Sequence, residues 1–231
     1  MHKRRLSCEE RKEAIVEAVL PVFARNGFAN TTTKQLAVAA GVSEALLYKH
    51  FPSKESLYAE IQNYGCQGCD LELQKLLSQE PSTSALVCIV YYAMRANIIG
   101  RSCGKIGMET RHRMILNSCL GDGSFTRFLF HNHFAENLSR MVEFVDAALA
   151  AGDLAPSTVS KRNLLLFAHQ LAIMVATMHL PDKPVVNYEA SREEVLNQAV
   201  WFALRGLGMR EESIKRFYNS KSLSLFFREQ Q

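Results

Sequence analysis

The 231-residue chain has few cysteines and no long apolar run, which argues against a disulfide-rich protein and a membrane protein. Its six cysteines are too few for a disulfide scaffold in a chain of this size. It has no run of 18 or more consecutive apolar residues, and the basic start, Met1–Arg5, leads into an amphipathic segment rather than an apolar signal region. We therefore expect a cytoplasmic protein with reduced thiols and no membrane segment.

The sequence also lacks the motifs of common enzyme classes. It contains no G-x-G-x-x-G, Walker loop, G-x-S-x-G or H-E-x-x-H, and no paired carboxylates in a setting that indicates a cleft. We expect no catalytic activity, no cofactor and no metal centre. Alternating strand patterns are missing too, so the apolar periodicity predicts an all-α protein.

The most informative stretch that is present covers residues 31–54, which predict a helix-turn-helix. Thr32 or Thr33 caps a first short helix, and Gly41 ends it where a residue without Cβ is favoured. Ser43 then caps a second short helix. A helix of this size fits the major groove of DNA and reads base edges from its N-terminal turn.

The preceding segment, Cys8–Asn26, predicts the helix that completes a three-helix module. Ser7 and Glu10 form a capping box at its start, and Gly27 follows its end. Apolar residues recur along one face of this helix: Ile15, Ala18, Val19, Val22 and Phe23.

These residues carry a family resemblance. The run from Ile15 to Leu57 resembles the N-terminal DNA-binding domain of TetR-type transcriptional regulators. The matched positions are Phe23, Gly27, Thr32, Leu36, Ala37, Ala40-Gly41-Val42-Ser43, Leu47-Tyr48, His50-Phe51 and Ser53-Lys54-Glu55. The resemblance covers about the first quarter of the chain. It implies a DNA-binding domain at 1–55 and an effector-binding and dimerisation domain at 56–231.

The family pattern also implies a function and roles for matching residues. It implies a homodimeric repressor that binds a pseudo-palindromic operator in double-stranded DNA and is released by a small, largely apolar effector. Phosphate contacts are expected from Thr33, Lys34, Tyr48, His50 and Lys54, and base contacts from Glu44, Ala45 and Lys49. Leu46 departs from the family, which commonly has a small hydroxyl residue there.

The charge distribution agrees with a DNA partner. Residues 1–58 hold nine Lys and Arg against six Asp and Glu, a net charge of +3 out of +4 for the whole chain. A positive bias concentrated in one domain is the electrostatic signature of a nucleic-acid-binding surface.

The remaining sequence predicts further helices. A connecting helix starts at Ser53 and is weakened at Gly65 and Gly68. The others are expected at Thr83–Ile99, Lys105–Ser118, Phe125–Ala151, Thr158–His179, Ser191–Gly206 and Met209–Tyr218.

The helix Thr158–His179 is apolar on more than one side, so it has to be buried on more than one side. Together with the final long helix it predicts a four-helix dimer interface across a two-fold axis. The expected interface residues are Phe167, Leu171, Ala172, Val175, Ala199, Phe202 and Ala203. The alternative is that this helix forms the core of a single protomer.

Aromatic residues and methionines in the second domain are candidates for an apolar effector pocket with a polar anchor. They are Tyr91, Met94, Met108, Met114, Phe128, Phe134, His169 and Met178. Two alternatives remain open. One is a DNA-binding architectural protein without an effector, and the other is a thiol- or metal-responsive regulator that uses Cys66 and Cys69.

Overall fold

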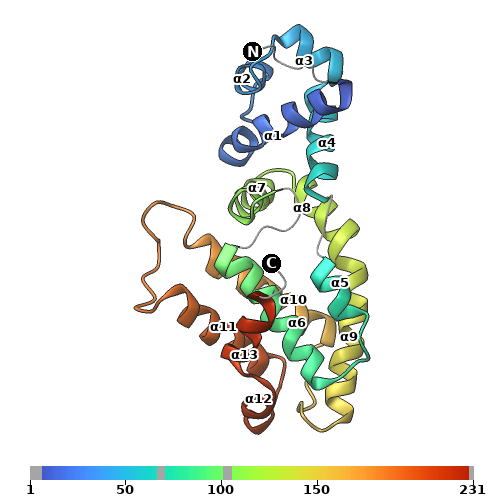
Figure 1. Ribbon diagram of the computed structural model, residues 1–231, viewed down its shortest axis with the longest axis vertical. Helices are drawn as coiled ribbons and strands as arrows, with labels where there is room; N and C mark the ends of the chain where they lie inside the picture. The colour runs from blue at the N-terminus through green and yellow to red at the C-terminus, as the bar shows by residue number, and fades with distance from the viewer. Residues whose placement is uncertain (1–6, 67–70, 101–105, 229–231) are drawn as a thin grey trace. The chain divides into compact units, whose positions relative to one another are not determined.

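The computed structural model describes residues 7–66, 71–100 and 106–228. All the elements of regular secondary structure in these ranges are helices (Figure 1). The prediction of an all-α protein is therefore confirmed. In chain order, the α-helices are α1 (Cys8–Asn26), α2 (Thr33–Ala39), α3 (Glu44–His50), α4 (Lys54–Cys66), α5 (Leu71–Leu77), α6 (Thr83–Arg95), α7 (Met108–Leu120), α8 (Ser124–Leu129), α9 (Ala135–Ala150), α10 (Lys161–Thr177), α11 (Arg192–Gly206), α12 (Glu211–Phe217) and α13 (Ser220–Arg228). Two π-helical turns, η1 (Ala96–Gly100) and η2 (Phe130–Phe134), follow α6 and α8.

The helices form two compact units. The first unit comprises residues 1–69 and 104–130, and the second comprises 70–103 and 131–231. This division differs from the boundary expected between residues 55 and 56. It differs because α4 packs on α1, and because α7 and α8 return to the first unit from much later in the chain.

The local signals of the first unit act as the sequence predicts. Ser7 and Glu10 form a capping box on α1, and Ser43 accepts a hydrogen bond from the Leu46 backbone N–H at the start of α3. Thr32 is the residue that caps α2. Gly41 has φ 62°, a left-handed conformation that favours glycine in the turn between α2 and α3.

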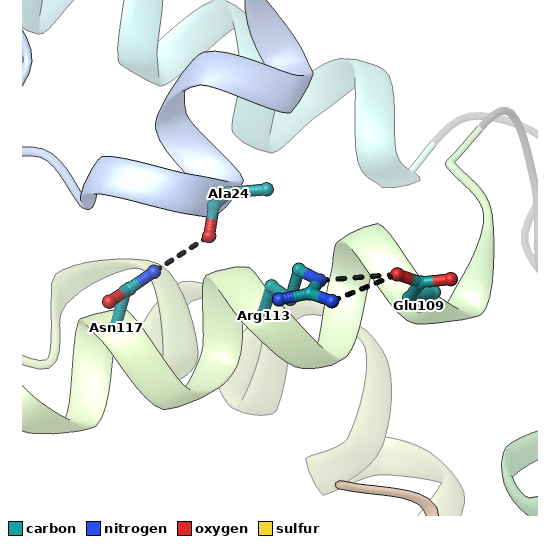
Figure 2. Close-up of polar contacts among 4 residues, drawn as sticks. All are labelled: Ala24, Glu109, Arg113 and Asn117. Atoms are coloured by element: carbon teal, nitrogen blue, oxygen red, sulfur yellow. Dashed lines mark hydrogen bonds and ion pairs between the residues drawn. The ribbon is translucent and has the colours of Figure 1, made fainter. Parts of the chain in front are cut away.

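Helix α7 supports α1 within this unit. The Asn117 side chain donates a hydrogen bond from Nδ2 to the Ala24 carbonyl at 2.7 Å, close to the C-terminal end of α1 (Figure 2). One turn earlier, Arg113 forms an ion pair with Glu109 at 3.1 Å along α7 itself. The core of the unit correspondingly contains side chains from both parts of the chain, including Phe23 on α1 and Phe125 on α8.

The second unit is built around α6, which packs against α9, α10 and α11. Figure 1 shows α6 between α9 and α11. The segment Thr83–Gly100 has a mean hydropathy of 1.3 and is long and apolar enough to cross a membrane, but 61% of it is buried inside the structure. Its apolar character is accounted for by its place in the core.

Several predicted helices differ from those observed. The expected single helix Phe125–Ala151 is divided into α8, η2 and α9, because the backbone widens to π geometry at 130–134. Helix α4 ends at Cys66 and α5 begins at Leu71, next to the two glycines expected to weaken a continuous helix. The sequence did not predict α13, whose Phe227 is buried on the core of the second unit.

Candidate nucleic-acid interface

The outer face of α2 and α3 carries most of the residues expected to contact DNA. Lys34 on α2 and Glu44, Ala45 and Lys49 on α3 are exposed, and Tyr48 is 45% exposed. On the opposite side of α3, Leu47 is buried in the core of the unit. The core therefore orients α3 and leaves its polar face open to a partner.

Thr33 and Glu44 lie together at the N-terminal ends of α2 and α3. The Thr33 hydroxyl donates a hydrogen bond to Glu44 Oε2 at 3.0 Å. This bond fixes the acidic side chain beside the first turn of α3. Glu44 is thus oriented before any DNA arrives, and Thr33 must give up this bond if it is to donate to a phosphate.

Lys54 is engaged inside the domain. Its Nζ donates to the Phe28 and Thr31 carbonyls, each at 3.0 Å, and lies 4.3 Å from the centroid of the Phe28 ring. An ammonium group has three donors. Two of them hold the start of α4 to the loop before α2, so Lys54 has a structural role in addition to the phosphate contact expected from sequence.

Two further positions on α3, His50 and Leu46, are less exposed than its other outward-facing residues. His50 is half-buried, and its Nδ1 lies 3.8 Å from the Cys8 Sγ at the start of α1. Leu46 is also half-buried.

The sequence interpretation missed a groove between α1 and α2. It is lined by Val22, Arg25, Asn26, Thr32, Lys34, Gln35, Val38 and Ala39. Arg25 is exposed and adds a second cation beside Lys34, while Val38 is 74% exposed. The polar residues at the end of the first helix could have indicated this groove, but in the sequence they served only to place the helix boundary.

Comparison with known proteins bears on this surface. Residues 13–61 match the family model described as bacterial regulatory proteins, tetR family. Residues 13–61 form a TetR-type DNA-binding domain. The transcriptional regulator RutR of Escherichia coli K12 is 42% identical over 59 residues, 26% of this chain and 28% of RutR. The nucleoid occlusion factor SlmA of Citrobacter koseri is 30% identical over 91 residues, 39% of this chain and 46% of SlmA.

The chain is thus aligned with less than half the length of these curated relatives. Solved structures extend the likeness in fold to most of the chain. A tetR-family regulator from Rhodococcus RHA1 has a TM-score of 0.61 at 18% identity, covering 87% of this chain and 98% of that one. AibR, solved with isovaleryl coenzyme A and operator DNA, has a TM-score of 0.61 at 18% identity, covering 83% of this chain and 97% of AibR.

Outside the TetR-type domain, the expected effector residues are divided between the two units. Met108, Met114 and Phe128 belong to the first unit, where Met114 is part of the core. The second unit contains the others: Tyr91, Met94, Phe134, His169 and Met178. Within it, the Phe134 and His169 rings lie 4.3 Å apart, whereas Tyr91 and Met94 are fully buried on α6.

Of the residues expected at the dimer interface, some are buried within the protomer and others are exposed. Ala172, Val175, Ala199 and Ala203 are buried within a single protomer, because α10 and α11 pack on its core. Phe167 is 58% and Phe202 70% exposed, and Leu171 is half-buried. Met174, which was not among the expected interface residues, is 54% exposed. Helix α10 therefore packs on the core of its own protomer and also has large apolar side chains that are exposed.

The Cys66 and Cys69 side chains lie outside the described residues. Across the residues that are described, no group of three or more His, Cys, Asp and Glu side chains is arranged to hold a metal ion.

Proposed function

We propose that this chain is a homodimeric, ligand-responsive transcriptional regulator that represses by binding a pseudo-palindromic operator. The observation that carries the proposal is the open face of α2 and α3, with its exposed Lys34, Tyr48 and Lys49 above a buried Leu47. Lysine ammonium and tyrosine hydroxyl groups donate to phosphates, and the first turn of α3 has the size and polarity to read base edges.

Dimerisation is supported by the exposed apolar side chains on α10 and α11. Phe167, Met174 and Phe202 are each more than half exposed on two helices that pack against each other. Large apolar side chains grouped on a surface mark an interaction site. A two-fold partner would cover them and would present two α3 helices to the two half-sites of an operator.

The connectivity of the chain supports communication between its two units. The chain passes between the units three times, at residues 69–70, 103–104 and 130–131. One of the returning segments contains α7, whose Asn117 holds the end of α1. A ligand bound by the second unit would act on the DNA-binding helices through this connectivity.

The relatives support this proposal and also supply its rival. AibR was solved with an acyl coenzyme A and operator DNA, and RutR is a transcriptional regulator, whereas SlmA is a nucleoid occlusion factor. The rival for this chain is a DNA-binding architectural protein without an effector.

Two measurements test the proposal. Selection from random DNA should recover a motif with two-fold symmetry, whose affinity falls steeply with salt because Lys and Arg displace phosphate counterions. Ligands retained on the natively purified protein are then identified by mass spectrometry and titrated by calorimetry with and without operator. Linkage predicts that operator weakens ligand binding by about 5- to 150-fold. Equal affinities would favour the architectural protein.

A further inference from the structure

Helix α6 contains one residue that its surroundings do not explain. Arg95 is the only charged residue between Thr83 and Gly100, yet its side chain is just 8% exposed. Its Nε atom is buried and has no hydrogen-bond partner. Within the described ranges, no carboxylate forms an ion pair with its guanidinium.

The described polar groups that follow Arg95 in the chain bond to the backbone of α6. The Asn97 side chain donates to the Ala93 carbonyl, and the Ala96 backbone N–H donates to the carbonyls of Ala93 and Tyr92. A buried cation without a counter-charge is expensive, so buried arginines in proteins are normally paired. An arginine guanidinium carries its charge in folded proteins. The buried Nε of Arg95 is therefore a donor that a negatively charged group from outside the described residues would satisfy.

The surroundings of Arg95 on α6 are apolar. Tyr91, Met94 and Ile98 lie on the same stretch of helix and are each about 99% buried in the core of the second unit. The α-helix changes to the π-helical turn η1 immediately after Arg95. Wide turns of this kind inside helices occur often at functional sites.

We propose that Arg95 binds the carboxylate of an amphipathic effector whose apolar part lies among the side chains of α6. This inference rests on the proposed function and specifies the effector of that same regulator. A carboxylate matches the planar guanidinium with two parallel hydrogen bonds. A single negative charge suffices, because the other buried polar side chains among the described residues of the second unit are the neutral hydroxyls of Thr83, Thr177 and Ser213.

The test uses the full-length protein and matched pairs of probes. Hexanoate, octanoate and decanoate are each compared with the neutral amide of the same length by calorimetry and by the shift in unfolding temperature. The wild type should bind at least one carboxylate about tenfold or more tightly than its amide, as expected for a hydrogen bond to a charged group. Arg95→Met should bind the pair equally, and Arg95→Lys should keep part of the preference. Arg192→Met, a change at an exposed arginine, is the matched control and should behave as wild type.

The unliganded proteins provide a second readout. Because the buried Nε of Arg95 has no hydrogen-bond partner, Arg95→Met should unfold at a temperature equal to or above that of the wild type. A purely structural arginine would give the opposite result. The proposal is overturned if no carboxylate in the series binds, if carboxylate and amide bind equally to the wild type, or if Arg95→Met keeps the preference. A neutral effector that releases operator would refute this inference and leave the proposed function intact.

Discussion

His112 offers a quantitative test of how α7 stabilises the DNA-binding unit. Its side chain is 2% exposed on α7, and burial, assisted by the nearby Arg111 charge, lowers its pKa to about 4. In the unfolded chain a histidine has a pKa of about 6.5. The folded unit therefore contains a neutral imidazole at pH 5, while the unfolded chain binds a proton.

The sign and size of the effect follow from this difference. Because the folded-state pKa is depressed, the stability is fully present above pH 6.5 and is lost as the pH falls toward 4. Between pH 7 and pH 5, proton uptake by the unfolded chain alone lowers the free energy of unfolding by about 2 kcal/mol. A neutral side chain such as glutamine at this position contributes no such slope.

Amide hydrogen exchange of α1 and α7 at pH 7 and pH 5, corrected for intrinsic exchange rates, measures this free energy locally. The wild type should lose about 2 kcal/mol more protection than His112→Gln over this interval. His50→Gln, in the same unit, controls for the removal of a histidine as such. Parallel pH slopes for wild type and His112→Gln would refute the assignment of a buried, neutral imidazole.

Two further predictions concern the DNA-binding and dimer surfaces. Lys54→Met should lower the free energy of unfolding of the first unit by about 1–2 kcal/mol, since it removes two hydrogen bonds from a charged donor. Lys34→Met, at an exposed lysine, should weaken DNA binding and leave stability unchanged. Urea unfolding and operator titration separate the two effects, and equal stabilities of the two variants would contradict the structural role of Lys54. Phe202→Glu should dissociate the proposed dimer, because the loss of one large apolar contact per protomer costs about 3–6 kcal/mol in total. Leu120→Glu, at a site that is 88% exposed, should have no such effect. Sedimentation that shows an intact Phe202→Glu dimer would place the interface elsewhere.

The sequence predicts the TetR-type domain well because its determinants are local. Ser7 with Glu10, Thr32 and Ser43 satisfy N–H groups within the next three residues, so their effect depends little on the rest of the fold. The structural role of Lys54, in contrast, depends on residues that are distant in the sequence. Its hydrogen-bond acceptors are carbonyls 23 and 26 residues earlier, and only the folded loop brings them within reach.

The effector candidates show the limit of residue type as a guide. Met108 and Met114 were grouped with Tyr91 and Met94 because all are large and apolar, but α7 belongs to the first unit and α6 to the second. A single charge in an apolar helix was a more specific signal. Arg95 could have been noticed as the only charged residue between Thr83 and Gly100, although its burial and its unpaired Nε required the structure.

The return of α7 and α8 to the first unit affects how this protein is made. The hydrogen bond between Asn117 and Ala24 joins residues 93 positions apart, and Phe125 completes a core that begins at Ile15. Chains fold as they leave the ribosome only when the partners of each contact have been synthesised. The DNA-binding unit therefore matures after more than half of the polypeptide has been translated, and a chimaera that exchanges only the first 55 residues would inherit three helices without the support that α7 and α8 provide.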